Sequence, residues 1–195
     1  MINPTPVPFP QSEGNSNVFV APVQENEIEF AENFGRIQGR FLYCANQDEL
    51  IRQLVELVSR QAWAQVFCRE SGLLPLLQDP LKGLLIADDL PEADASITGC
   101  EALIARTGSI MMSSGQESGR LVSVYAPVHI CIAWTNQLVY DIREGLDMLL
   151  EKYKNKIPSF ITMATGPSRT ADIEKTLVVG VHGPKEVYVF LVEAP

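Results

Sequence analysis

The sequence predicts one α/β domain, a three-layer arrangement in which helices cover both faces of a mainly parallel sheet. Three observations support this fold class. Apolar segments of strand length alternate along the chain with segments whose apolar residues recur at helical spacing. The length of 195 residues suits a single well-buried domain and would make two domains cramped. A composition of 46% hydrophobic and 20% charged residues is typical of a globular protein.

The first half of the chain predicts an arm followed by alternating helices and strands. Residues 1–24 predict an extended arm, because the first twenty residues carry four prolines and three asparagines with little periodicity. The domain itself is expected over residues 25–195. The elements predicted up to residue 87 are a helix over 25–37, a strand over 40–45, a helix capped by Asp48, a strand over 62–68, a helical turn over 71–78 and a strand over 82–87.

The second half continues the alternation. Thr98 and Glu101 have the spacing of a capping box, so residues 102–104 either continue a short helix or already form a strand. The later predicted elements are strands over 109–112, 121–125 and 128–134, a helix headed by Asp141 and Glu144, and strands over 160–164 and 187–192.

Charge and hydropathy exclude two classes of partner. The formal net charge of −9 disfavours nucleic acid, which attracts a basic surface. No apolar run approaches the roughly 18 residues of a membrane span, and the start lacks the basic head of a signal peptide. We therefore expect a cytoplasmic protein.

The motifs of several cofactor and metal sites are absent from the sequence. It contains neither the dinucleotide fingerprint Gly-x-Gly-x-x-Gly, nor a Walker loop, nor a Gly-x-Ser-x-Gly elbow. The four cysteines are far apart, without a Cys-x-x-Cys pair, and we expect them to behave as small buried hydrophobes: Cys44, Cys68, Cys100 and Cys131. His129 is expected to be a satisfied histidine of a strand. We predict no metal and no cofactor.

The segment from Gly166 to Pro184 is the first candidate site, because it is long, polar and rich in glycine between two predicted strands. Gly166 permits close approach of the backbone, and Ser168 or Thr170 can cap a short helix over 171–176. The N–H groups at such a helix start, with Arg169 beside them, would bind a carboxylate or phosphate.

Two alternatives remain open for the charged residues of this segment. Asp172 and Glu174 either belong to the ligand site or hold Arg169 in an internal ion pair. His182, followed by Gly183, either donates a hydrogen bond or proton to an anion or fixes the loop by bonds to the backbone.

The loop over residues 113–120 is a second candidate site. Ser113, Ser114 and Arg120 follow a predicted strand, the usual position of ligand contacts in an open α/β sheet. Ser113, Ser114 and Arg120 are therefore candidate anion ligands. The alternative is a solvated hairpin loop.

Three sequence blocks resemble the LUD domain family, the family of the lactate-utilization protein C. They are TGCEALIARTGSI over 98–110, GRLVS over 119–123 with APVHI over 126–130, and GPSRTADIE over 166–174 with GVHGP over 180–184. The resemblance covers roughly residue 25 to the end, and the proline-rich arm departs from the helix with which such proteins usually begin.

The resemblance implies a fold like that of the sugar-phosphate isomerases and coenzyme A transferases. It also implies a role in oxidising L-lactate to pyruvate, beside an iron–sulfur partner and a cysteine-rich partner. This chain lacks the ferredoxin-like cysteines of the iron–sulfur relative, as expected for a small member without a cluster. The resemblance assigns no catalytic residue, so whether the chain is an enzyme stays open.

Three functions follow from these observations. The first is a subunit or accessory protein of a lactate-oxidising system that binds a small anion or a partner at the Arg169 and His182 loops. The second is a free-standing enzyme on a sugar-phosphate or acyl-CoA substrate, with Asp172 or Glu174 acting beside His182. The third is a purely structural interaction module.

Overall fold

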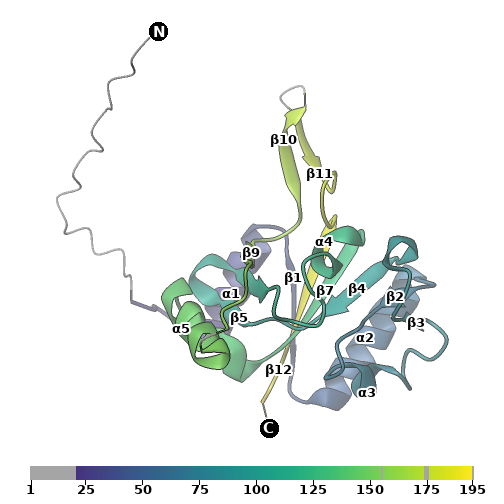
Figure 1. Cartoon of the computed structure of the whole chain (residues 1–195), viewed down its shortest axis with the longest axis horizontal. Helices are drawn as coiled ribbons and strands as arrows, with labels where there is room; N and C mark the ends of the chain where they lie inside the picture. The colour runs from purple at the N-terminus through teal and green to yellow at the C-terminus, as the bar shows by residue number, and fades with distance from the viewer. Residues whose placement is uncertain (1–20, 155, 174–175, 195) are drawn as a thin grey trace.

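A parallel sheet of six strands forms the centre of the molecule (Figure 1). The computed structural model describes residues 21–154, 156–173 and 176–194, and for 171–173 and 176–178 only the backbone. In spatial order the strands are β1 (Arg40–Cys44), β12 (Glu186–Val192), β7 (Val128–Trp134), β4 (Ala95–Thr98), β2 (Val66–Phe67) and β3 (Leu85–Ile86). Every neighbouring pair is parallel, which confirms the predicted mainly parallel α/β sheet.

The neighbouring strands β7 and β12 are nearly continuous apolar runs because both of their faces are covered. Successive side chains of a strand point to opposite faces. Tyr188 and Phe190 accordingly pack into the core on one face, whereas Val187 and Val189 pack into the core on the other.

Helices α2 (Gln47–Gln61) and α3 (Leu74–Leu77) cover the first face. Leu50, Leu54 and Leu57 of α2 are buried there at helical spacing. The cap of α2 was predicted wrongly: Asn46, not Asp48, accepts the hydrogen bond, with 2.9 Å between its Oδ1 atom and the nitrogen of Glu49. An amide oxygen caps the first turn as well as a carboxylate, and Asp48 lies two residues after the cap, inside the first turn.

The second face is covered by helix α1 (Asn26–Arg36) and a second sheet. In spatial order the strands of this sheet are β8 (Leu138–Val139), β5 (Ala102–Ile104), β6 (Ser109–Ser113) and β9 (Ile161–Ala164). Helix α5 (Ile142–Tyr153) packs on its outer side, with Leu149 against Ile104 and Met111. The helix-covered layers around the main sheet confirm the three-layer α/β fold. No helix in the described part of the chain is long and apolar enough to cross a membrane.

Two predictions between residues 98 and 125 were wrong. Thr98 ends β4 and residues 102–104 form β5, so the capping box of Thr98 and Glu101 does not exist. Glu101 is instead buried in a side-chain network. The predicted strand over 121–125 is the short helix α4 (Val122–Tyr125), whose Val122 packs with Ala126 at helical spacing. The described residues include the 3₁₀ helices η1 (Leu90–Glu92), η2 (Ala105–Thr107) and η3 (Thr135–Gln137), which connect other elements.

The predicted helix over 171–176 was also wrong. Strands β10 (Arg169–Ile173) and β11 (Thr176–Val179) pair antiparallel and project from the body of the molecule (Figure 1). Residues that favour extended backbone are frequent in both strands, since Val, Ile and Thr are β-branched. Gly166 and Gly180, with φ angles of 77°, flank the pair in a conformation that favours glycine.

Candidate functional site

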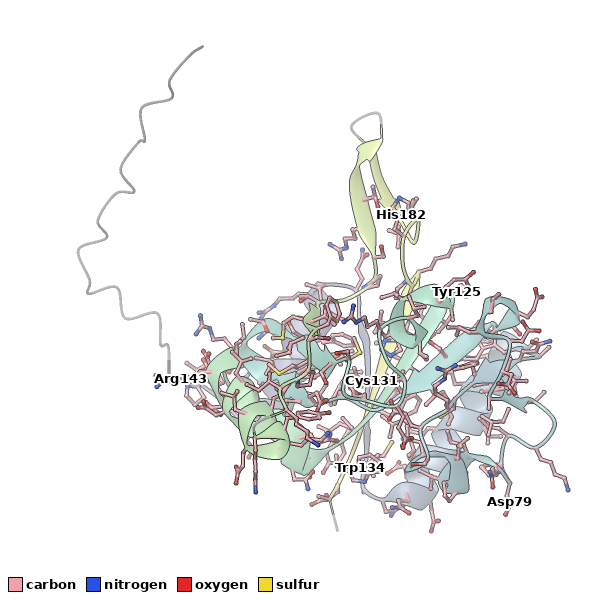
Figure 2. All side chains as sticks on the ribbon, viewed as in Figure 1. Asp79, Tyr125, Cys131, Trp134, Arg143 and His182 are labelled. Carbon is pink, nitrogen blue, oxygen red and sulfur yellow. The ribbon has the colours of Figure 1, made fainter. Side chains whose placement is uncertain are left out.

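The predicted segment from Gly166 to Pro184 lies at the amino ends of the main strands. The backbone N–H of Lys185 donates to the carbonyl of Pro127 over 2.7 Å, just before β12 and β7 begin. Figure 2 shows His182 near the base of the β10–β11 hairpin and Trp134, the last residue of β7, at the opposite end of the sheet. In open α/β sheets, ligands bind beyond the carboxyl ends of the strands. The segment is therefore at the less usual end for a ligand site.

The structure brings several residues of this segment together at the base of the hairpin. Main-chain bonds of 2.9 Å join Ser168 to Pro184 and to Gly180. A Cβ atom on Gly183 would lie 2.8 Å from that of Ser168, so only glycine fits there. These contacts fix the loop through backbone groups.

Arg169 packs back onto the body of the protein from the hairpin. Its Nη2 atom donates to the carbonyl oxygen of Ile37 over 2.8 Å, and the side chain is otherwise exposed. A Cβ atom on Gly166 would lie 2.7 Å from the same carbonyl oxygen. Because residues 169–173 form a strand, the predicted anion seat at a helix start is absent from the described residues.

The other predicted residues of the segment do not assemble around Arg169 in the described structure. Thr170 and Asp172 continue β10, where only the backbone of Asp172 is described, and Glu174 lies outside the described residues. His182 is exposed. A role for these residues in binding stays a prediction.

Ser113 and Arg120 lie elsewhere. Ser113 pairs with Ile161 at the start of β9, so the length of β9 separates it from Gly166. Its hydroxyl donates to Glu101 Oε1 over 2.6 Å. Arg120 donates to the hydroxyl of Ser159 over 2.8 Å and stacks over the ring of Phe160. The two predicted sites are therefore separate.

His129 is a satisfied core histidine, as predicted. It is buried, and its Nε2 atom lies 2.8 Å from the hydroxyl oxygen of Thr98. Because that hydroxyl donates to the carbonyl of Gly99, it accepts from the imidazole N–H. Burial lowers the pKa of His129 to about 4, so the ring is neutral at physiological pH.

A cavity of about 330 Å³ lies beyond the carboxyl ends of β2 and β4, and we call it the crevice. Its lining residues come from the loops after β2, β4 and β6 and from the end of α5. They are Glu70, Ser71, Gly72, Cys100, Gly115, Gln116, Glu117, Lys152 and Tyr153. This is the end of the sheet where α/β proteins bind ligands.

Glu70 has one carboxylate oxygen bound and one free among the described residues. Oε2 accepts from the backbone N–H of Gly99 over 2.9 Å. Oε1 is buried and has no hydrogen-bond partner in the described structure. A Cβ atom on residue 99 would lie 2.9 Å from Glu70 Oε2, so Gly99 makes room for this carboxylate. Buried carboxylate oxygens normally have a donor, so Glu70 is the feature of the crevice that calls for an explanation.

Glu101 forms the centre of a network with Lys152 and Tyr153, two residues that line the crevice. Its Oε1 atom accepts from the hydroxyls of Ser113 and Tyr153, the latter over 2.8 Å, and its Oε2 atom accepts from Lys152 Nζ over 2.8 Å. The side chain of Glu101 is 2% exposed and that of Lys152 is 58% exposed. A Cβ atom on Gly115 would lie 2.5 Å from the Tyr153 hydroxyl, so this glycine admits the ring.

The network shifts the pKa values of its members. Burial alone would lower the pKa of Lys152, but the hydrogen bond and the charge of Glu101 raise it above its usual value. Burial raises the pKa of Tyr153, and the hydrogen bond to Glu101 adds to this effect. Lys152 is therefore an ammonium, and Tyr153 is a neutral phenol, at physiological pH.

Two other residues that line the crevice are bonded to each other: the backbone N–H and the hydroxyl of Ser71 both donate to Glu117. The N–H of Ser71 makes the larger contribution to the lowered pKa of Glu117. These bonds tie the loop after β2 to the loop after β6.

All four cysteines are buried and free, as the sequence predicted. Burial raises the pKa of Cys44 and that of Cys68 to about 11. A hydrogen bond to Cys100, together with burial, raises the pKa of Cys131. Thiols with raised pKa values are poor nucleophiles and poor metal ligands. No group of three or more His, Cys, Asp or Glu side chains in the described ranges is arranged to hold a metal ion.

Sequence reasoning missed most residues of the crevice. Ser113, which supports one wall, was selected, but Glu70, Lys152 and Tyr153 were not. The run Glu70-Ser71-Gly72 could have indicated the site, because it follows a predicted buried strand. Ser113 was selected for the same reason, its position after a predicted strand.

A six-stranded parallel sheet with a polar crevice beyond its carboxyl ends places the protein in the open-sheet α/β class. The family model described as LUD domain matches residues 60–192, more than half of the chain. The chain belongs to the LUD domain family.

Curated relatives match about half of the chain. It is 36% identical to a protein named Lactate utilization protein C from Deinococcus radiodurans over 105 residues, which are 53% of this chain and 49% of the relative. It is also 36% identical to Lactate utilization protein C from Bacillus subtilis over 103 residues, 52% of this chain and 43% of the relative. The matched part thus spans about half the length of these relatives.

A solved structure shares the fold. The crystal structure of a DUF162 family protein from Deinococcus radiodurans superposes with a TM-score of 0.59 and 22% sequence identity. The superposition covers 86% of this chain and 94% of that one. It supports the three-layer α/β architecture.

Proposed function

We propose that this chain is a subunit or accessory protein of a system that oxidises L-lactate to pyruvate. The observation that carries the proposal is membership of the LUD domain family together with relatives named Lactate utilization protein C at about 36% identity. The resemblance of residues 166–184 to the family supports the same role.

The proposed system includes partners that accept electrons. Oxidation of lactate to pyruvate releases two electrons and two protons, which an acceptor must take. We propose that iron–sulfur and cysteine-rich subunits are these partners, as the family resemblance implies. The hairpin of β10 and β11 is the proposed contact, because it projects from the body and carries exposed Arg169 and His182 at its base (Figures 1 and 2). A small carboxylate or phosphate is the alternative occupant of this base.

Gene deletion and affinity purification test the role. Deletion is expected to abolish growth on L-lactate and to leave growth on glucose unchanged. The tagged chain is expected to retain iron–sulfur and cysteine-rich proteins, identified by mass spectrometry. Intact growth on L-lactate after deletion, combined with the absence of both partners, would refute the proposal.

A matched pair of variants tests the contact. Arg169→Ala is expected to lower partner retention, whereas Arg60→Ala, on the exposed end of α2, is expected to retain the partners. Equal retention by the two variants would show that the base of the hairpin is not the contact.

The crevice favours one alternative, a free-standing enzyme on a sugar-phosphate or acyl-CoA substrate. Its support is a crevice lined by two carboxylates, Glu70 and Glu117, and by Lys152, at the end of the sheet where ligands bind in open α/β proteins. Thermal-shift screening of sugar phosphates, hydroxy acids and CoA esters separates the two functions. A stabilising sugar phosphate or CoA ester, with no response to hydroxy acids, would favour the enzyme.

A further inference from the structure

Strand β1 lies at an edge of the main sheet, and its free side carries main-chain groups that the sheet does not use. Among the described strands it pairs with β12 alone. The carbonyl of Cys44 accepts from the N–H of Glu193, so Cys44 points toward β12. Successive residues of a strand direct their N–H and C=O groups to opposite sides, so Phe41 and Tyr43 point to the free side. The Tyr43 carbonyl agrees with this direction, because it accepts from the side chain of Gln53 over 3.4 Å.

A hollow beside this edge leaves room for the side chains of an added strand. It has a volume of about 400 Å³ and is lined by residues of β1 and of helix α2. Leu42 and Leu57 contribute apolar surface to its lining, and both pack in the core of the first face. Gln53, Glu56 and Arg60 of α2 are polar side chains of the same lining. A strand paired with the free side of β1 would cover the hollow, as edge strands allow.

The sequence of β1 is complementary to itself in the antiparallel direction. A strand pair centred on Leu42 places Phe41 of each copy opposite Tyr43 of the other. These are the two residues whose N–H and C=O groups point to the free side, so each such pair exchanges both of its main-chain hydrogen bonds. Phe41 packs on the second face, and Tyr43 shares that face by strand alternation and is 42% exposed. Aromatic pairs across two strands stabilise a sheet.

The charges of helix α2 are complementary to themselves in the same way. Glu49, Gln53, Glu56 and Arg60 recur at helical spacing and form one stripe on the side of β1. When two copies of α2 lie antiparallel, Glu49 of each copy stands opposite Arg60 of the other. The same arrangement places Gln53 opposite Glu56. The stripe therefore joins opposite charges across a two-fold axis.

One two-fold axis serves both the strand and the helix. The midpoint of the α2 stripe lies within one helical turn of Gln53. Gln53 bonds to the carbonyl of Tyr43, the residue directly after Leu42, which is the centre of the strand pair. The centres of the two patterns thus lie side by side. A second copy that pairs through β1 brings the opposite charges of α2 together in the same register.

We propose that this edge is the contact between two copies of the chain, which pair antiparallel through β1 and α2 into a two-fold dimer with one continuous sheet. Both copies contribute the same surface, as in most homodimers. Charge complementarity selects a second copy as the occupant, because each copy supplies both the carboxylate and the guanidinium of the helix contact. The dimer does not depend on the proposed role in lactate oxidation, and none of the residues that line the hollow lines the crevice.

Size-exclusion chromatography with light scattering, over a dilution series of the full chain, tests the dimer. The unmodified protein is expected to have twice the chain mass of 21.5 kDa and to dissociate on dilution. A monomer at every concentration would overturn the proposal. The occupant of the edge would then be an extended segment from elsewhere in this chain or from another protein.

Tyr43→Pro tests the strand pair. It removes an N–H that points to the free side and leaves the bonds of β1 to β12 in place, which is the position where an edge strand accepts proline. The variant is expected to keep the circular dichroism of the folded protein and to be a monomer. Tyr43→Phe keeps both the N–H and the ring, and it is expected to remain a dimer. A dimeric Tyr43→Pro would overturn the proposal.

Two charge reversals test the helix contact. Arg60→Glu places a carboxylate opposite Glu49 of the second copy, and Glu49→Lys places an ammonium opposite Arg60 of the second copy. Each variant alone is expected to dissociate at least about tenfold more readily than the unmodified protein, because like charges then face each other. Lys82→Glu makes the same change in charge close to β3, the opposite edge of the sheet, and is expected to leave the dimer unchanged.

Mixing the two reversed variants is the decisive measurement. In a heterodimer of Arg60→Glu with Glu49→Lys, both helix contacts join opposite charges, so the mixture is expected to regain the dimer mass. A variant that failed to fold could not give this result. A mixture that stays monomeric, or reversals that leave the dimer intact, would overturn the assigned contact.

Discussion

Replacement of His129 is predicted to remove a large part of the acid sensitivity of the fold. The imidazole is buried, and its pKa falls from the usual value of about 6.5 to about 4 in the folded protein. The unfolded chain therefore binds a proton at this residue between pH 6.5 and pH 4, whereas the folded chain does not. The stability that His129 contributes is complete above pH 6.5 and is lost as the pH falls toward 4.

The expected loss is about 3 kcal/mol, because the two pKa values differ by about 2.5 and each pKa unit is worth about 1.4 kcal/mol. Urea unfolding at a series of pH values from 7.5 to 4.5 measures it. His129→Gln keeps a group that can donate to Thr98 but cannot titrate. The free energy of unfolding of the variant is expected to fall less steeply with pH than that of the unmodified protein.

Carboxylates also titrate in this pH range. The quantity to compare is therefore the difference between the unmodified protein and His129→Gln in the free energy of unfolding at each pH. Carboxylate titration is common to both proteins and cancels in that difference. Curves that run parallel between pH 6.5 and 4.5 would show that His129 is accessible to protons in the folded state. The burial argument would then be wrong.

Three further variants test the helix cap, the buried network and the crevice. Asn46→Ala is expected to lower the free energy of unfolding by about 1 kcal/mol in urea titration, because it removes the acceptor at the start of α2. Glu101→Ala is expected to destabilise by about 2–3 kcal/mol in the same assay, because it leaves buried donors without their acceptor. Gly99→Ala is expected to lower the free energy of unfolding by about 1–3 kcal/mol, because the added Cβ displaces the carboxylate of Glu70 from its bond to the residue 99 N–H, whereas Gly72→Ala, with open space around its Cβ, is expected to change it little.

The sequence predicts the main sheet because its strands are defined by local composition. The runs over 128–134 and 187–192 are apolar enough to be buried on both faces wherever they pair, so a parallel, covered sheet follows from them. The second sheet cannot be predicted from local composition in the same way. Its strands are short, and residues 102–104 fit a helix or a strand until their neighbours β6 and β8 are known.

The wrong predictions arise where a local signal competes with tertiary contacts. Ser168 and Thr170 are good helix caps, but the β-branched residues that follow favour the paired strands of the hairpin. Glu101 has the spacing of a capping box, but burial beside Lys152 gives it different partners. Such an outcome depends on residues distant in the sequence.

Glu70 could not be selected from the sequence for the same reason. Its bond to Gly99 joins residues 29 positions apart, and Lys152 and Tyr153 reach the crevice from a helix near the other end of the chain. The sequence does predict that the strands are parallel. In a parallel sheet the loops after β2 and β4 lie at the same edge. A polar residue just after each buried strand is thus a better guide to this site than the density of polar residues in one loop.

The two candidate sites lie at opposite ends of the sheet, and this separation distinguishes their proposed roles. The hairpin and His182 stand beyond the amino ends of β7 and β12, whereas the crevice lies beyond the carboxyl ends of β2 and β4 (Figures 1 and 2). The hairpin projects and exposes Arg169 and His182, which suits a macromolecular contact. The crevice is concave and lined by polar side chains, which suits a small ligand. Because no residue lines both places, a variant at Arg169 should alter partner retention alone and one at Glu70 should alter ligand affinity alone, so the separation itself is open to experiment.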